Sequence, residues 1–261
     1  ADAAGGGGSG AGAPAAAASL AIVPFAAPAG GAAAKLQALA DERMRPERVV
    51  AFPACSTVGS LQLRQLPGRA LGAYAWTAGV ELACYVERRF AGRVAGLRVL
   101  ELGSGTGVTA IALARLGARV TATDMLPELV ALIEENAAAA GLRPGRCRAV
   151  VHTWGEALEG ALLGHFDVVL GSEITYNEGG FEPLLATLRA ICLRPRDGTA
   201  PPLVLLAETL RNDRQRFFWA LAGREFAARE VASVPQRDSW NVRDASAPVR
   251  IFEGLPFARV A

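Results

Sequence analysis

The sequence predicts an α/β protein with a seven-stranded, mostly parallel sheet that is covered by helices on both faces. After Gly96, short apolar segments alternate with amphipathic segments of helical spacing, and a glycine-rich turn follows the first apolar segment. This alternation is typical of parallel strands joined by crossover helices. The chain has 261 residues, which is long enough for one large domain with a substantial core. We therefore expect a Rossmann-like architecture.

The expected strands and helices follow one another in a regular order. Apolar segments predict five strands, at Arg98–Leu102, Arg119–Thr123, Cys147–His152, Asp167–Gly171 and Leu203–Ala207. Two more, at Glu225–Ser233 and Val249–Glu253, are close enough in the chain to form an antiparallel pair. Helical spacing predicts helices over Thr106–Leu116, Pro127–Ala140, Phe181–Leu193 and Asp213–Leu221. The second of these helices has both end signals, because proline opens it and Gly141 follows it.

The part of the chain before Gly96 divides in two. Residues 1–34 are low-complexity Ala, Gly and Pro with Asp2 as the only charge, and we expect a disordered tail there. Residues 35–95 contain two short strand-like segments around Gly59, which predict a β-hairpin, and then the helical segment "AWTAGVELACYVERRF". We expect this hairpin and helix to form one globular unit with residues 96–261.

The composition argues against several classes of function. A formal charge of +2 is too close to balance to indicate nucleic-acid binding by bulk electrostatics. The four cysteines are far apart and there are two histidines, so we expect no metal site. No segment resembles a transmembrane helix, and the tail resembles neither a secretory signal nor a transit peptide, so we expect no membrane contact.

The turn "ELGSGTG" is the most informative stretch of the sequence. Gly103, Gly105 and Gly107 follow a strand and precede a helix, and glycine there lets the backbone turn sharply and approach a ligand. A dinucleotide-binding turn would have its third glycine at position 108, which is Val108. Glu101, at the end of the strand, would repel a pyrophosphate. We therefore expect a positively charged ligand without phosphates.

A second acidic residue ends the next strand. Asp124 lies where doubly wound sheets accept the two ribose hydroxyls of a nucleoside, and Met125 beside it can lie against an adenine face. S-adenosylmethionine combines a ribose and an adenine with a sulfonium and an ammonium group, and has no phosphate. The alternative is that Glu101 and Asp124 only cap strand ends around a tight turn.

These motifs resemble a known family. "VLELGSGTG" followed by "TATD" is similar to the first two motifs of the class I, seven-strand methyltransferases. Four more segments resemble the protein-lysine methyltransferases that include the enzymes acting on cytosolic Hsp70 and on valosin-containing protein. They are "AWTAGVELACYV", "HTWGE", "VVLGSEITY" and "VRIFE", and the resemblance covers about residues 48–257.

The resemblance implies a set of cofactor contacts. Gly103, Ser104 and Gly105 would hold the methionine part of the cofactor, and Asp124 would hold the ribose. Trp76 matches an early tryptophan that contacts the cofactor, Trp154 an aromatic beside the adenine, and Ser172 a small residue after the fourth strand. For both tryptophans, packing in the core is the alternative.

The resemblance also implies a catalytic pair. The family signature after the fourth strand is Asp-x-x-Tyr, and this chain has Glu173 and Tyr176 in those positions. Glu173 would orient the lysine amine and stabilise its positive charge, and Tyr176 would form a wall of the lysine channel. Glutamate has one more methylene than aspartate, so the position of its carboxylate is open.

The expected function is therefore methylation of a lysine in another protein, with S-adenosylmethionine as cofactor. Two alternatives remain at this point: methylation of a small-molecule amine, and a non-catalytic module that binds the cofactor. The resemblance implies a monomer in the cytoplasm, with a chaperone or another abundant cytosolic protein as partner, and leaves the nucleus and the organelles open. Nucleic acid is a weaker candidate, because "SEITY" replaces the Asn/Asp-Pro-Pro-aromatic segment of nucleic-acid amine methyltransferases.

Overall fold

The computed structural model of the chain describes residues 41, 44–55, 57–192, 200–211, 213–224, 226–235 and 247–256. The predicted disordered tail, residues 1–34, lies outside these ranges. None of the described helices is long and apolar enough to cross a membrane.

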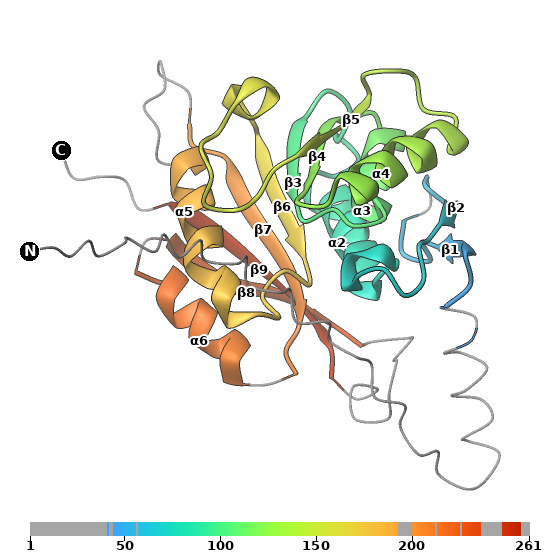
Figure 1. Ribbon diagram of the computed structural model, residues 1–261. Coiled ribbons are helices and arrows are strands. Elements are labelled where there is room, and N and C mark those ends of the chain that lie inside the picture. The colour runs from blue at the N-terminus through green and yellow to red at the C-terminus, as the bar shows by residue number, and fades with distance from the viewer. Residues whose placement is uncertain are drawn as a thin grey trace, which may run out of the picture.

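A seven-stranded sheet forms the centre of the protein, with the strand order β5-β4-β3-β6-β7-β9-β8 (Figure 1). Neighbouring strands from β5 to β7 are parallel, and β9 runs antiparallel to both β7 and β8. This confirms the predicted fold. The strands are β3 (Arg98–Leu102), β4 (Arg119–Asp124), β5 (Cys147–Val151), β6 (Val168–Ser172), β7 (Leu203–Thr209), β8 (Phe226–Val234) and β9 (Val249–Pro256).

Helices cover both faces of the sheet, as the strand and helix alternation predicts (Figure 1). One apolar cluster packs α2 (Thr77–Arg89), α3 (Val108–Arg115) and α4 (Pro127–Ala139) on one face. A second cluster packs α5 (Phe181–Cys192) and α6 (Asp213–Ala222) on the other. Three short 3-10 turns join these elements: η1 (Leu71–Ala73), η2 (Gly160–Leu163) and η3 (Glu178–Gly180).

The helix after the glycine turn starts later than predicted. It begins at Val108 and not at Thr106. Gly107, which precedes it, has a φ of 81°, a left-handed conformation that cannot belong to a right-handed helix. The glycine turn therefore extends over its full predicted length before the helix begins.

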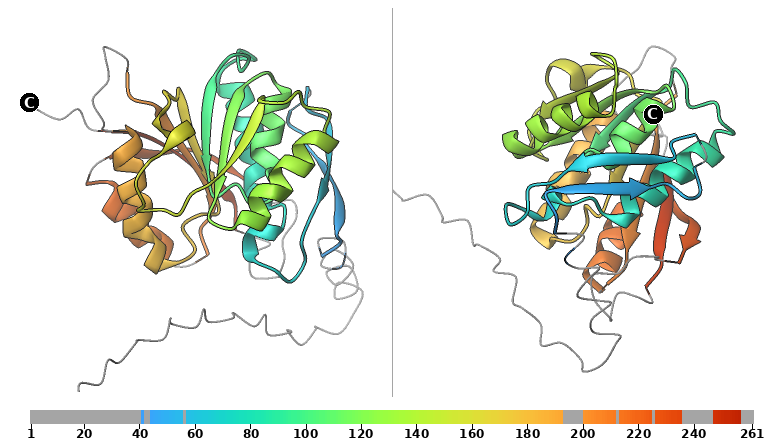
Figure 2. Two further views of the ribbon diagram at one scale, coloured as in Figure 1. Left: turned by 45° about the horizontal axis from the view of Figure 1, so that its top comes forward. Right: turned by 90° about the vertical axis from the view of Figure 1, so that its right-hand side faces the viewer.

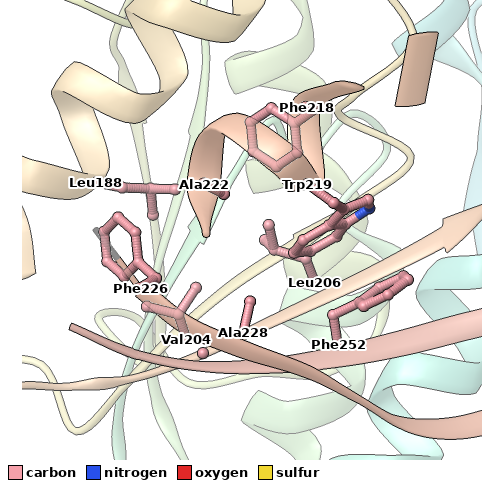
Figure 3. A pocket seen from close by; sticks show the side chains of 10 residues that line it. Leu188, Val204, Leu206, Phe218, Trp219, Ala222, Phe226, Ala228 and Phe252 are labelled. Carbon is pink, nitrogen blue, oxygen red and sulfur yellow. The ribbon is translucent and has the colours of Figure 1, made fainter. Parts of the chain in front are cut away.

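A small apolar cavity of about 20 Å³ lies between α6 and the C-terminal strands (Figure 3). Trp219 stacks on Phe252 at its wall, with ring centroids 3.9 Å apart. The residues that line the cavity are mostly apolar, and none of them belongs to the glycine turn: Leu188, Val204, Leu206, Phe218, Trp219, Ala222, Phe226, Ala228, Phe252 and Gly254. The cavity is therefore part of the core on this face of the sheet and is separate from the predicted cofactor site.

The predicted N-terminal hairpin is present as a separate two-stranded sheet. It consists of β1 (Glu47–Ala51) and β2 (Ser60–Arg64), which pair antiparallel and lie outside α3 and α4 (Figure 2). Alternate residues of β2, Leu61 and Leu63, are buried in the same apolar cluster as the helices. The hairpin thus adds a third layer on this face.

Asn136 attaches the hairpin to the rest of the fold. This buried side chain of α4 accepts a hydrogen bond from the Arg64 amide at 2.8 Å and donates to the Arg64 carbonyl at 3.0 Å. It also donates to the carbonyl of Thr106, in the glycine turn, at 2.9 Å. One buried amide therefore connects the hairpin, helix α4 and the glycine turn.

Replacing Asn136 by alanine should lower the free energy of unfolding by about 2–4 kcal/mol, because it removes the partner of the partly buried Arg64 amide and carbonyl and of the buried Thr106 carbonyl. Urea denaturation followed by circular dichroism measures this change. The control is Glu135→Ala on the same helix, whose exposed ion pair with Arg64 should contribute less than about 1 kcal/mol. Equal effects of the two substitutions would contradict the assignment.

Candidate active site

The glycine turn between β3 and α3 has no room for a side chain at its glycine positions. Gly103, Gly105 and Gly107 all have positive φ values, of 64°, 55° and 81°. A Cβ atom on Gly105 would overlap the carbonyl oxygen of Gly72 in η1, and one on Gly103 would lie 2.9 Å from Cγ2 of Ile174. The sharp backbone turn predicted from these glycines is therefore present, and the close approach to a ligand stays a prediction.

Asp124 lies at the end of β4, beside this turn. Its Oδ2 accepts a hydrogen bond from the Gly105 amide at 3.1 Å, and its Oδ1 accepts one from the Leu126 amide at 3.2 Å. The side chain is buried, and burial raises the pKa of its carboxyl above the ordinary value. The carboxylate is thus fixed at the carboxyl edge of the sheet, where a ribose would be held.

Glu101 is the second acid of this region and has an unusual environment. It is only 1 % exposed, and its Oε2 has no hydrogen-bond partner among the described residues. Burial raises the pKa of its carboxyl to about 7, although the hydroxyls of Thr109 and Ser104 act in the opposite direction. A buried carboxyl oxygen without a partner is costly unless a donor or a cation binds it. An ammonium group would meet this need, so the residues present fit a cofactor such as S-adenosylmethionine.

The other predicted cofactor residues lie around the same edge. The six-membered ring of Trp154 lies 3.3 Å from the position of a Cβ on Gly103, and the side chain also packs against the apolar cluster under α5. Ser172 ends β6 with its Oγ 3.2 Å from the position of a Cβ on Gly79 in α2. Met125 is 59 % exposed beside Asp124. The structure therefore places Trp154 at the glycine turn, where it also packs in the core, Ser172 against α2, and Met125 in solvent at the end of β4.

Glu173 has a backbone conformation that is rare for a residue with a side chain. Its φ is 53°, in the left-handed region, and its amide donates to the carbonyl of Ala207 on β7 at 2.9 Å. Non-glycine residues in this region are strained by about 1–3 kcal/mol and are common at functional sites. The strand end at Glu173 is therefore a sharp turn that β7 holds in place.

The side chain of Glu173 is bound by two residues that sequence reasoning did not identify. Its Oε1 accepts hydrogen bonds from the Thr209 hydroxyl at 2.7 Å and the Thr209 amide at 3.2 Å. Arg211 donates to Oε2 at 2.5 Å and to Oε1 at 3.3 Å. The only signal for Thr209 and Arg211 is that polar residues in "AETLRN" follow a predicted parallel strand, at the edge where ligands bind.

Trp76 joins this group of residues. The guanidinium carbon of Arg211 lies 5.7 Å from the centre of the Trp76 ring, and the indole N–H donates to the Leu71 carbonyl at 2.9 Å. Trp76 was predicted to contact the cofactor, and the structure places it between η1, which covers the glycine turn, and the Arg211–Glu173 ion pair. A cation over an indole face is attractive, so this contact helps to fix Arg211.

Tyr176 lies farther out than Glu173. The side chain is 52 % exposed, and no hydrogen bond joins it to Glu173 in the described part of the chain. Partial burial, together with the charge of Asp124, raises the pKa of its phenol. Tyr176 is therefore accessible from solvent, and its role as a wall of the lysine channel stays a prediction.

One further acidic residue was missed in the sequence. Glu208 on β7 is fully buried, and its Oε1 accepts a hydrogen bond from the Ile174 amide at 3.2 Å. Burial raises the pKa of its carboxyl well above the ordinary value, and the charge of Glu173 adds to this effect. In the sequence Glu208 looks like an ordinary polar residue at a strand end.

Among the described residues, no cluster of His, Cys, Asp and Glu could hold a metal ion.

The raised pKa of Glu101 predicts how stability depends on pH. An unfolded glutamate has a pKa of about 4.3, and the native pKa is about 7, so between these values the native protein holds a proton that the unfolded chain releases. The free energy of unfolding should therefore fall as pH rises through this window. Glu101→Gln should remove this contribution, so that the variant gains stability relative to the parent between pH 5 and pH 8.

Urea unfolding of the cofactor-free protein at several pH values measures this gain. The exposed Glu159→Gln serves as the control for removing one carboxyl. A stability difference between Glu101→Gln and the parent that stays constant with pH would contradict the assignment.

Comparisons with known proteins identify the family of the chain. Residues 57–224 match the lysine methyltransferase family. Mouse protein N-lysine methyltransferase METTL21A is 36 % identical over 184 residues, which cover 69 % of this chain and 80 % of the relative. Mouse EEF1A lysine methyltransferase 3 is 37 % identical over 140 residues, which cover 53 % of this chain and 59 % of the relative.

Solved structures with low sequence identity share the fold. A tRNA (uracil-54, C5)-methyltransferase of Pyrococcus abyssi has a TM-score of 0.52 at 14 % identity, over 81 % of this chain and 44 % of that chain. A putative RNA methyltransferase of Pyrococcus horikoshii has a TM-score of 0.51 at 17 % identity, over 74 % of this chain and 93 % of that chain. The seven-stranded sheet, the glycine turn with its acidic residues and the family match lead to one conclusion: the chain belongs to the lysine methyltransferase family, a group of S-adenosylmethionine-dependent enzymes that act on proteins.

Proposed function

We propose that this protein methylates the ε-amino group of a lysine in a chaperone or another abundant protein of the cytoplasm, with Glu173 and Tyr176 at the lysine site. Glu101, Gly103, Ser104, Gly105, Gly107 and Asp124 hold the cofactor, together with Trp76, Met125, Trp154 and Ser172. The name of one relative, an EEF1A lysine methyltransferase, makes elongation factor 1A a second candidate substrate.

The observation that carries the proposal is the adjacency of β3 and β6. Leu102, the last residue of β3, is in register with Gly171 of β6. The glycine turn follows Leu102 directly, and Glu173 lies two residues beyond Gly171. A cofactor in the turn therefore has the turn at Glu173 as its neighbour at the same edge of the sheet, where a second substrate must approach the methyl group.

The lysine site must hold the substrate's ε-amine in its neutral form and in the correct orientation. S-adenosylmethionine supplies an activated methyl group when it is bound. A lysine ammonium, with an ordinary pKa of about 10.4, has no lone pair for attack and must lose a proton, which a desolvated channel favours. Orientation of the lone pair toward the methyl carbon is then the main task of the surrounding side chains.

Glu173 has capacity for this task even though Arg211 and Thr209 already bind it. An ionised carboxylate can accept about four hydrogen bonds, two on each oxygen. Oε1 accepts from Thr209 and Arg211, whereas Oε2 accepts only from Arg211 in the described hydrogen bonds. One acceptor position on Oε2 therefore serves the amine, and the carboxylate stabilises the positive charge that the amine gains as it is methylated.

A labelling experiment tests the proposed function. The protein is incubated with tritiated S-adenosylmethionine and a cell extract, and in parallel with purified Hsp70 chaperone and elongation factor 1A. We expect label in a discrete protein band and, after hydrolysis, in methyllysine. Asp124→Ala should lose the label, because the cofactor is no longer held. Label in a small product only, or no transfer, would contradict the proposal.

Substitutions at the lysine site test the assigned roles. Glu173→Ala should lower the transfer rate by about 10²–10³-fold, and Tyr176→Phe by about 10-fold, because both groups orient the amine. Cofactor affinity, measured by calorimetry, should change little in both variants. Glu182→Ala, an exposed glutamate on α5, is the control. Full activity of both lysine-site variants, while Asp124→Ala is inactive, would disprove the assignment.

A further inference from the structure

We infer that Glu208 is a positioning residue for methyl transfer: its buried carboxyl accepts the Ile174 amide and so holds the turn that carries Glu173 and Tyr176. This inference rests on the proposed function, because Glu208 is fully buried and acts through that turn. It names a residue that neither the Asp-x-x-Tyr type of signature nor the glycine turn contains.

The turn needs an external support because its backbone is strained. Glu173 adopts a φ of 53°, which is unfavourable for a residue with a Cβ atom. Such a conformation persists only when the surrounding structure determines it. Without support, residues 173–176 would relax toward ordinary extended backbone, and the Glu173 carboxylate and the Tyr176 phenol would move relative to the cofactor site.

The end of β7 supplies this support through three consecutive residues. The Ala207 carbonyl accepts the Glu173 amide at 2.9 Å, and Oε1 of Glu208 accepts the Ile174 amide at 3.2 Å. The amide and the hydroxyl of Thr209 then donate to the Glu173 carboxylate. Glu208 contributes a side-chain acceptor for a backbone amide of the turn. This bond takes the place of the strand ladder, which ends at Glu173.

Ile174 connects Glu208 to the cofactor site. Its side chain leaves no room for a Cβ on Gly103 or on Gly171, so it fills the space between the glycine turn and β6. A displaced Ile174 amide would therefore move a side chain that touches the glycine turn. Glu208 acts on the lysine site through the backbone and on the neighbouring turn through Ile174.

The environment of Glu208 explains how a carboxyl can be buried beside Glu173. Its Oε2 and the buried Thr175 hydroxyl have no hydrogen-bond partner in the described residues. Arg211 binds Glu173, and Arg250, the register partner of Glu208 on β9, pairs with Glu230 at 3.1 Å. With both arginines engaged, burial and the charge of Glu173 raise the pKa of Glu208 well above its ordinary value, which favours the neutral acid. A neutral acid still accepts the Ile174 amide.

Two substitutions separate positioning from other roles. Glu208→Gln keeps a neutral oxygen acceptor, whereas Glu208→Ala removes it. With tritiated S-adenosylmethionine and increasing amounts of the cell extract, the rate at saturating extract should fall about 10–100-fold for Glu208→Ala and less than about 3-fold for Glu208→Gln. The extract concentration at half-maximal rate should change little. Glu253→Ala, another buried glutamate of the sheet, should lose stability but keep the rate.

Hydrogen exchange gives a readout that does not need activity. The amides of residues 173–176 should exchange faster in Glu208→Ala than in the parent, and at the parental rate in Glu208→Gln. Unchanged exchange in Glu208→Ala, or equal losses of rate in the Ala and Gln variants, would overturn the inference. Absence of transfer by the parent protein would refute the proposed function instead, and the exchange data would still decide whether Glu208 holds the turn.

Discussion

The backbone of Gly105 lies against that of Gly72 with no room for a side chain, and the geometry of the site depends on this contact. It brings η1, a segment outside the central sheet, over the glycine turn. The Gly105 amide also donates to Asp124, so the end of β4 is fixed at the same point. Trp76 follows η1 and lies under Arg211. One close approach therefore connects the cofactor side of the site with the residues around Glu173.

Glu101, Glu173 and Glu208 are three of the four acids around the site, and they meet the cost of burial in different ways. Glu173 is paired with Arg211, the pKa of Glu208 beside it is raised well above the ordinary value, and Glu101 has a pKa of about 7 and an oxygen without a partner among the described residues. A site for a sulfonium and an amine needs negative charge, but unpaired buried carboxylates are costly. An ion pair lowers this cost at Glu173, and the raised pKa values of Glu101 and Glu208 favour the neutral acid there. Under the proposed function, the cofactor's ammonium group binds the unpartnered oxygen of Glu101.

The sequence predicted those features that depend on neighbours in the chain. Alternating apolar segments located the strands, and the glycines and Asp124 indicated the sheet edge that we propose for the cofactor, because these signals are local. The Arg211–Glu173 ion pair spans 38 residues and depends on the register between β6 and β7, which no local pattern encodes. Glu208 was missed for the same reason. Its role depends on which amide its side chain meets across the sheet, and the sequence shows only a polar residue after an apolar strand.

The same register explains how glutamate can occupy the first position of the Asp-x-x-Tyr signature that the sequence resembles. The carboxylate of Glu173 does not stay over its own turn. It extends to the next strand, where Thr209 and Arg211 fix both of its oxygens. An aspartate is one methylene shorter, so it could not keep all these contacts from the same backbone position. The place of the carboxylate is therefore set by β7 and the residues that follow it. Accordingly, Thr209 and Arg211 determine where the Glu173 carboxylate lies and, under the proposed function, where it meets the lysine amine.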